Sequence, residues 1–311
     1  MKKMNKNLKL FLKLIVGLLI VVLLFLYYKI GLRELYETIL QINLFFLGMS
    51  LILFLISYLL SALTLKILAS FFDGKISFWK IFEFNMRSYS IGLFSPGRIG
   101  EFSFLYFLKK NGLDYGKGGV IFFIDKMITF TTISAISIFG ILILVKEINP
   151  TFMLLTALAI PIGLIVFVYA VVSNKGRDLI KKYFLKKHAQ YLMGFSSNLA
   201  EIVKKRFHFL VLNLVITIGR WTLGALIVYL LFIAFGNHVD FMKVWLINPL
   251  IILVSIVPIS IAGLGIREGS AVVLYGFVGV HASITLEVYF LITAINYLVG
   301  SCVNLYYLFR K

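Results

Sequence analysis

Charged side chains are scarce in this sequence of 311 residues, since only 14% of them are Asp, Glu, Lys or Arg. A soluble domain carries about 25% charged and about 45–50% apolar residues, whereas 61% of the residues here are hydrophobic. This balance excludes a soluble enzyme and a disordered chain. It predicts an all-α polytopic membrane protein.

Cysteine is almost absent, and other chemical signatures are missing as well. The single cysteine, Cys302, cannot form an internal disulfide, which excludes a disulfide-stapled secreted module. Cysteines and histidines with metal-ligand spacing, a phosphate-binding Gly-x-x-x-x-Gly-Lys-Ser/Thr loop and an Asp-x-Asp pair do not occur. We therefore expect no metal site, no cofactor and no nucleotide hydrolysis by this chain.

Six apolar stretches are each long enough for a helix that crosses a membrane, which needs roughly 20 mostly apolar residues. The first stretch follows a lysine-rich start, and no small-residue cleavage site comes after it. Residues 1–30 are therefore interpreted as an uncleaved signal anchor. The six predicted spans are residues 8–28, 44–65, 127–145, 152–173, 207–235 and 284–308.

Two further apolar stretches are interrupted by proline and glycine. Residues 81–108 break at 95–101, and residues 243–279 break at 258–268. Arms of about 10–14 residues rise only about 15–21 Å, which is too short to cross a hydrocarbon core of about 30 Å. We predict two re-entrant hairpins of broken helix. The residues expected to form the breaks are Pro96, Gly97, Gly100, Pro258, Gly263 and Gly265.

The distribution of Lys and Arg predicts the orientation of the chain. If the N-terminus is cytoplasmic and both hairpins return to the side they left, the cytoplasmic segments hold 23 of the 31 Lys and Arg residues and the external segments hold 4. Such an excess follows the positive-inside rule. We expect a plasma-membrane protein with both termini in the cytoplasm, and the net charge of +18 indicates orientation rather than nucleic-acid binding.

The predicted organisation is a single membrane domain with an internal repeat. Residues 44–145 and 207–308 each contain a span, a broken hairpin and a span, and the two units run in opposite senses. This is the pattern of inverted-topology repeats, whose broken helices meet near the membrane midplane and form a substrate site. Between them, the basic segment 174–206 is either an ordinary cytoplasmic loop or an amphipathic helix on the anionic leaflet.

Each break carries one arginine and one glutamate: Arg98 with Glu101, and Arg267 with Glu268. A charge at the centre of the bilayer costs roughly 2.5–3.5 kcal/mol, so these side chains need partners or a water-filled cavity. The arginines are candidates for holding a phosphate bidentately. Alternatively, the charges of each pair only neutralise each other, or the two pairs cross-pair and lock the hairpins together. Arg220, inside the fifth span, is a further candidate for facing a cavity.

Three short motifs resemble one known family. They are Pro96-Gly97-Arg98-Ile99-Gly100-Glu101 followed by Leu105-Tyr106, Pro258 with Gly263-Leu264-Gly265-Ile266-Arg267-Glu268, and Ile124-Asp125-Lys126. Together they are similar to motifs of the lysylphosphatidylglycerol synthase transmembrane-region family, also described as flippase-like, and the resemblance runs from about residue 10 to 308. It implies a membrane domain that moves or accommodates lipids.

The sequence departs from this family in two places. The last span carries Asn296-Tyr297 where the family pattern has an arginine. The full-length lysyltransferases add a soluble aminoacyltransferase domain, for which no room remains before Lys311, so we do not expect lysyl transfer.

The favoured function is therefore a non-enzymatic lipid translocase that binds an anionic head group at Arg98 and Arg267. The alternatives are a membrane transferase of lipid-linked substrates (a phosphatidylglycerol lysyltransferase or a polyprenyl-phosphate glycosyltransferase) and a transporter of small anions. The expected partners are membrane lipids, with a separate lipid-modifying enzyme or a second copy of the chain as candidate protein partners.

Overall fold

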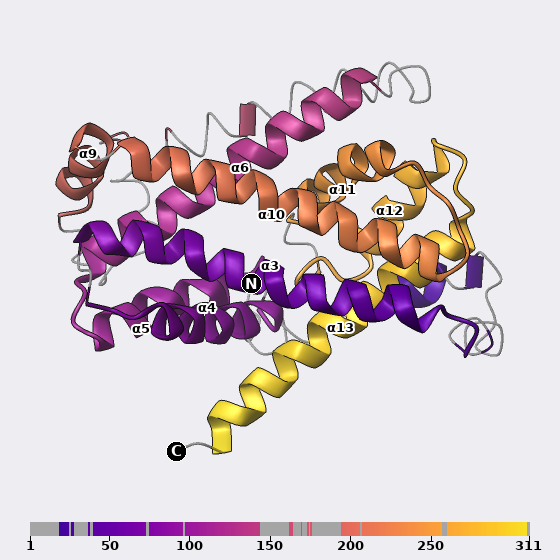
Figure 1. Cartoon of the computed structure of the whole chain (residues 1–311), viewed down its shortest axis with the longest axis horizontal. Helices are drawn as coiled ribbons and strands as arrows, with labels where there is room; N and C mark the ends of the chain where they lie inside the picture. The colour runs from indigo at the N-terminus through magenta and orange to yellow at the C-terminus, as the bar shows by residue number, and fades with distance from the viewer. Residues whose placement is uncertain are drawn as a thin grey trace, which may run out of the picture. The chain divides into compact units, whose positions relative to one another are not determined.

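The described part of the molecule is built from helices (Figure 1). The computed structural model describes residues 19–24, 26–27, 37, 40–72, 75–95, 97–143, 162–163, 169, 173, 175, 194–205, 207–256 and 260–309. Its helices are α3 (Leu44–Phe72), α4 (Phe78–Leu93), the 3₁₀ helix η1 (Ile99–Phe102), α5 (Ser103–Lys110), α6 (Tyr115–Ile143), α9 (Phe195–Lys205), α10 (Phe207–Ala234), α11 (Phe241–Ser255), α12 (Ile266–Gly276) and α13 (Ala282–Phe309).

Four of these helices, α3, α6, α10 and α13, are long and apolar enough to cross a membrane. Each has 28 or 29 residues, a length of about 42–44 Å at 1.5 Å per residue. They agree with four of the six predicted spans. The other two predicted spans, 8–28 and 152–173, lie largely outside the described residues, so the total of six stays a prediction.

The start of α6 differs from the prediction. The sequence placed this span at 127–145, whereas the helix begins at Tyr115. The first turns of α6 contain three glycines and Lys117, which hide their helical pattern, but they bury Val120 and Ile121 in a hydrophobic core. Asp125 and Lys126 therefore lie well inside the helix instead of at its first turn.

The order of helices repeats once along the chain. A long helix, a medium one, a break, a short one and a long one follow each other in α3–α4–α5–α6 and again in α10–α11–α12–α13. The medium helices α4 and α11 have 16 and 15 residues, so they rise only about 24 and 22 Å. Both interruptions fall where the sequence predicts them. Their entry from opposite membrane faces stays a prediction.

Packing divides the chain into two compact units. The first unit comprises residues 1–57, 86–102 and 222–311, and the second comprises residues 58–85 and 103–221. Helices α3, α4 and α10 each contribute to both units. Both breaks belong to the first unit. The division into repeats 44–145 and 207–308 follows chain order instead of packing and remains a prediction.

The second unit has its own hydrophobic core, to which α3, α4, α5, α6 and α9 contribute. Phe84 of α4 and Phe107 of α5 stack with ring centroids 5.9 Å apart. Phe195 and Ile202 of α9 are buried in the same core. The apolar side of this amphipathic helix, which lies in the basic segment 174–206, is therefore covered by protein.

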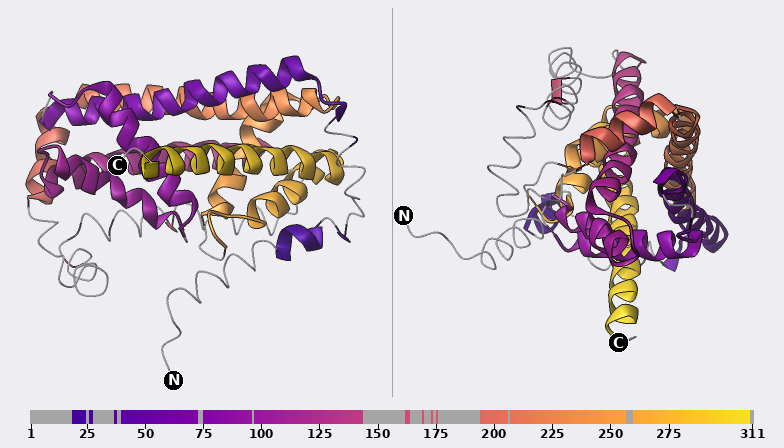
Figure 2. Two further views of the ribbon diagram at one scale, coloured as in Figure 1. Left: turned by 90° about the horizontal axis from the view of Figure 1, so that it is seen from below. Right: turned by 90° about the vertical axis from the view of Figure 1, so that its left-hand side faces the viewer.

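In the first unit, α12 packs against both α11 and α13. The rings of Phe232 and Tyr275 lie 5.0 Å apart, and those of Tyr275 and Tyr289 lie 5.9 Å apart. Trp245 Nε1 donates a hydrogen bond of 3.1 Å to Thr222 Oγ1, which joins α11 to α10. Helix α13 is one uninterrupted helix (Figure 2), and α12 packs along it in this unit.

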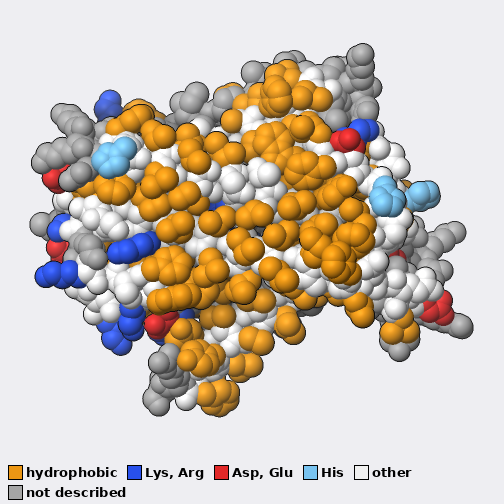
Figure 3. All heavy atoms as spheres, in the orientation of Figure 1, with side chains coloured by type: hydrophobic (Ala, Val, Ile, Leu, Met, Phe, Trp, Pro, Cys, Tyr) orange, Lys and Arg blue, Asp and Glu red, His pale blue; other side chains and the backbone are white. Residues whose placement is uncertain are grey.

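Hydrophobic side chains cover much of the face of the molecule drawn in Figure 3. Helix α3 illustrates this, because several of its large apolar residues are exposed, among them Leu44, Phe45, Ile52 and Leu55. In water such a surface would promote association. In a membrane it is the surface that contacts acyl chains.

Candidate functional site at the two helix breaks

The second break positions its charged residues through the first turn of α12. Gly265 adopts a left-handed backbone with φ of +80°, and its N–H donates a 2.7 Å hydrogen bond to Glu268 Oε2. This side chain thereby satisfies one of the unpaired N–H groups at the start of a helix. This hydrogen bond fixes the position of the Glu268 carboxylate. Arg267 precedes it in the same first turn of α12.

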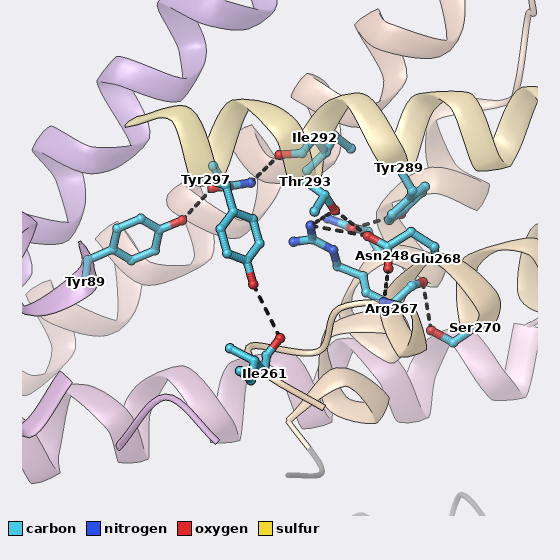
Figure 4. Close-up of polar contacts among 12 residues, drawn as sticks. Tyr89, Asn248, Ile261, Arg267, Glu268, Ser270, Tyr289, Ile292, Thr293 and Tyr297 are labelled. Atoms are coloured by element: carbon cyan, nitrogen blue, oxygen red, sulfur yellow. Dashed lines mark hydrogen bonds and ion pairs between the residues drawn. The ribbon is translucent and has the colours of Figure 1, made fainter. Parts of the chain in front are cut away.

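Arg267 and Glu268 form a buried cluster with Thr293 of α13 (Figure 4). Arg267 Nη2 donates to the Thr293 hydroxyl, which in turn donates to Glu268 Oε1. Arg267 Nη2 also lies 3.7 Å from Glu268 Oε1, and the two side chains are only 11% and 1% exposed. The positive and negative charges therefore compensate each other in a place from which solvent is largely excluded.

The first break has a different local construction. The Ser95 hydroxyl donates to Gly92 O at 2.9 Å and accepts from the Gly100 N–H at 2.7 Å, so it ties the loop to the end of α4. Gly100 lies directly against the α4 backbone: a Cβ atom added there would be 2.5 Å from Ile91 O. Only glycine fits this approach.

Arg98 and Glu101 form a more exposed pair than their counterparts in the second break. Arg98 Nη1 lies 3.5 Å from Glu101 Oε1, and the side chains are 40% and 14% exposed. The guanidinium also lies 5.7 Å from the centroid of the Tyr89 ring, within the range of a cation–π contact. Glu101 packs over Gly92, where an added Cβ would be 2.7 Å from Glu101 Cγ.

Helix α13 contacts the second break and the end of α4 along one side. Besides Thr293, Asn296 Oδ1 accepts from the Tyr89 hydroxyl, and Gly300 O accepts from the Ser90 hydroxyl. Residues three and four apart on a helix share a face. The same face therefore joins the second break, through Thr293, to the end of α4, which leads into the first break.

Tyr297 of α13 also lies between the two breaks. Its hydroxyl donates to Ile261 O at 3.4 Å (Figure 4). Its ring meets that of Phe94 edge-on, with centroids 5.5 Å apart. The sequence singled out Asn296 and Tyr297 only as departures from a family pattern, and it missed Thr293 and Tyr89. Polar residues inside an apolar span, at helical spacing, are the signal that could have found them.

Arg220, the remaining candidate, belongs to the second unit. Its Nη2 donates to Thr129 Oγ1 of α6 at 2.9 Å. This contact is part-buried. The second unit also holds a buried polar contact that the sequence did not predict: the Thr64 hydroxyl donates to Asp125 Oδ1 at 2.8 Å. Asn213 Nδ2 donates to Thr64 O at 3.0 Å, so these contacts join α3, α6 and α10.

The other predicted break residues are partly described. Gly97 and Gly263 adopt left-handed backbones with φ of +57° and +81°. Pro96 and Pro258 lie outside the described residues.

Comparisons with known proteins confirm the family that the sequence resembles. A family model described as "Lysylphosphatidylglycerol synthase TM region" matches residues 10–303. A curated protein named "UPF0104 membrane protein", from Methanothermobacter thermautotrophicus, is 23% identical over 218 residues. This match covers 64% of the chain but only 60% of the relative, so the chain matches less than two thirds of that relative's length.

No solved structure matches the chain. The family match, however, covers nearly the whole sequence, and the four long apolar helices lie within it or extend only a few residues beyond it. The chain is therefore a multi-pass integral membrane protein that belongs to the lysylphosphatidylglycerol synthase TM region family.

Proposed function

We propose that this protein binds a lipid with an anionic head group at its two charged breaks and carries that lipid between the leaflets of the membrane. The observation behind the proposal is that two interrupted helices, each with an Arg–Glu pair, lie against one side of α13. Interrupted helices with charged residues are the usual setting of substrate sites in transporters with repeated units.

The chemistry of the breaks suits a phosphate-containing head group. Guanidinium groups bind phosphate oxygens through parallel N–H···O bonds. The surrounding surface of exposed apolar side chains would keep the acyl chains in contact with the membrane while the head group moves.

Orientation and location form part of the same proposal. We propose that the protein lies in the plasma membrane, that both of its termini are in the cytoplasm, and that the two hairpins enter the membrane from opposite faces.

Cysteine labelling tests this orientation. After Cys302→Ser removes the exposed native thiol, Lys110→Cys should react with an impermeant maleimide only from the cytoplasm. His238→Cys should react only from outside. Labelling of both positions from one side would contradict the model of opposed hairpins.

The basic segment 174–206 is proposed to contact the anionic cytoplasmic leaflet. It contains nine Lys and Arg residues, and each basic residue near such a surface contributes about 1 kcal/mol. Because α9 buries Phe195 and Ile202 in the second unit's core, this contact would be electrostatic instead of an insertion of the α9 apolar face.

The decisive experiment is leaflet-resolved transport in proteoliposomes of the purified protein. Fluorescent phosphatidylglycerol in the inner leaflet should become accessible to an external quencher faster than in protein-free vesicles. Phosphatidylcholine with the same fluorophore should move more slowly because its head group has no net negative charge. Equal rates with and without protein for every lipid tested would reject the proposal.

A further inference from the structure

The two break arginines differ in ways that assign them different tasks. We infer that Arg98 is the residue that binds the anionic head group, that Glu101 holds its guanidinium until the anion replaces the carboxylate, and that Arg267 instead holds the second break in place. This inference rests on the proposed function and names the binding residue within that site.

Arg267 is poorly suited to exchange its partners. Its side chain is 11% exposed, it donates to Thr293, and Glu268 beside it is held at both carboxylate oxygens by Thr293 and the Gly265 N–H. An incoming anion would have to displace a carboxylate that also caps α12. The cluster is therefore a fixed support between α12 and α13.

Arg98 has the opposite properties. Its side chain is 40% exposed, against 11% for that of Arg267, so an anion can reach the guanidinium from outside the break. Glu101 remains seated over Gly92 whichever anion Arg98 contacts. An anion can thus replace the carboxylate at the guanidinium without dismantling the break.

The backbone at Arg98 gives an independent reason. Its φ of +56° lies in the left-handed region, which is unfavourable for residues with a Cβ atom and tends to occur at functional sites. Among the described residues, one other non-glycine position has a positive φ: Ala262 in the second break, at +51°. Glycine would relax the backbone at both positions, but at residue 98 it would also remove the guanidinium.

The neighbours of Arg98 indicate the class of ligand. Large apolar residues near it in the chain are exposed, namely Ile91, Phe94, Ile99 and Phe102. A phosphate could come from a lipid head group or from a soluble phosphate ester. Because the positive charge belongs to a stretch of chain with several exposed apolar side chains, an amphiphile with its acyl chains along these residues fits better than a free anion.

The test compares four variants of the full-length protein: Arg98→Gln, Arg98→Gly, Ala262→Gly and Arg267→Gln. Each is reconstituted in nanodiscs of phosphatidylcholine with a small fraction of fluorescent phosphatidylglycerol, and lipid binding is measured by energy transfer from protein tryptophan. Glycerol 3-phosphate is added as the soluble competitor. Melting temperature is measured for the same samples in detergent.

We expect both Arg98 variants to bind phosphatidylglycerol about tenfold more weakly, or worse, since a hydrogen-bonded charge is lost. Arg98→Gly should melt above Arg98→Gln, because only glycine relaxes the backbone. Ala262→Gly, the matched control for that relaxation, should bind like the natural protein. Arg267→Gln should lower the melting temperature most. Glycerol 3-phosphate should compete only weakly.

Two results would overturn the inference. One is unchanged phosphatidylglycerol binding by the Arg98 variants, and the other is displacement of the lipid by glycerol 3-phosphate at concentrations similar to those of the lipid. If the natural protein binds phosphatidylglycerol through Arg98 but moves no lipid across vesicles, the proposed transport fails while the assignment of Arg98 stands.

Discussion

The two breaks share a motif of glycine, arginine and glutamate, yet they bury it to different extents. In the second break the charges are adjacent in sequence, and Glu268 caps α12 while Thr293 bridges both side chains. In the first break the charges are three residues apart, and the nearby polar contact with α13 goes from Tyr89 to Asn296 instead. The comparison teaches that the facing residue on α13, as well as the motif, decides whether an arginine is held or accessible.

Large destabilising effects are expected at the glycines that allow close backbone approach. In Gly100→Ala the new Cβ would be 2.5 Å from Ile91 O, and in Gly263→Ala it would be 2.9 Å from Ser255 O. Overpacking costs about 1–3 kcal/mol, and the left-handed backbone at Gly263 adds about 1–2 kcal/mol. Thermal melting should show both variants destabilised, Gly263→Ala more strongly.

The matched control is Gly276→Ala at the end of α12, where an added Cβ would meet nothing within 4 Å. This variant should melt at or slightly above the natural protein, since alanine favours helix. If Gly100→Ala melted like Gly276→Ala, the close approach at the first break would be wrong.

The next effect separates the two glutamates. Glu268→Gln leaves the buried Arg267 charge without a compensating partner, which costs about 3–5 kcal/mol. Glu101→Gln should cost about 0–1 kcal/mol, because Arg98 remains accessible to solvent or head groups. Chemical or thermal denaturation of the purified variants measures the difference.

A double variant completes that comparison. Arg267→Gln combined with Glu268→Gln removes both buried charges, so it should recover much of the stability lost in Glu268→Gln. Equal losses for Glu101→Gln and Glu268→Gln would instead show that both breaks are held in the same way.

A smaller loss of stability is expected when the hydrogen bonds that connect the breaks to α13 are removed. Thr293→Val removes the hydroxyl shared by Arg267 and Glu268, which should cost about 1–3 kcal/mol. Tyr89→Phe removes one hydrogen bond to Asn296 and should cost about 1 kcal/mol. Melting curves that ranked the two in the reverse order would contradict the greater burial of the second break.

The smallest expected change in lipid binding comes from Gly92, against which the Glu101 side chain packs. In Gly92→Ala the new methyl group would lie 2.7 Å from Glu101 Cγ, so the carboxylate must move away from its position. Stability should change little, because alanine is also the better helix former. Binding of phosphatidylglycerol should become slightly tighter as Glu101 competes less, and weaker binding would argue against competition.

Much of the fold follows from local properties of the sequence. The four long helices follow from apolar length, and the breaks follow from glycine and proline between short arms. The start of α6 did not follow, because glycines near Tyr115 hide a helix that tertiary packing stabilises. Local pattern is a weak guide where packing decides.

The candidate site was predictable only in part. The motifs identified Arg98, Glu101, Arg267 and Glu268, since charges in apolar stretches are conspicuous. The partners Thr293 and Tyr89 depend on how α13 is aligned with α12 and α4, which no local pattern specifies. The left-handed backbone of Arg98 was equally hidden, because arginine does not favour it.

The continuity of α13 has a mechanical consequence. Thr293 and Gly300 are separated by about 10 Å along the axis of one rigid helix, and each anchors the chain near a different break. If α13 slid along its axis or turned about it, the contact at Thr293 and the contact at Gly300 would both be displaced. Short of bending or unwinding α13, any shift of this helix therefore acts on the contacts of both breaks together.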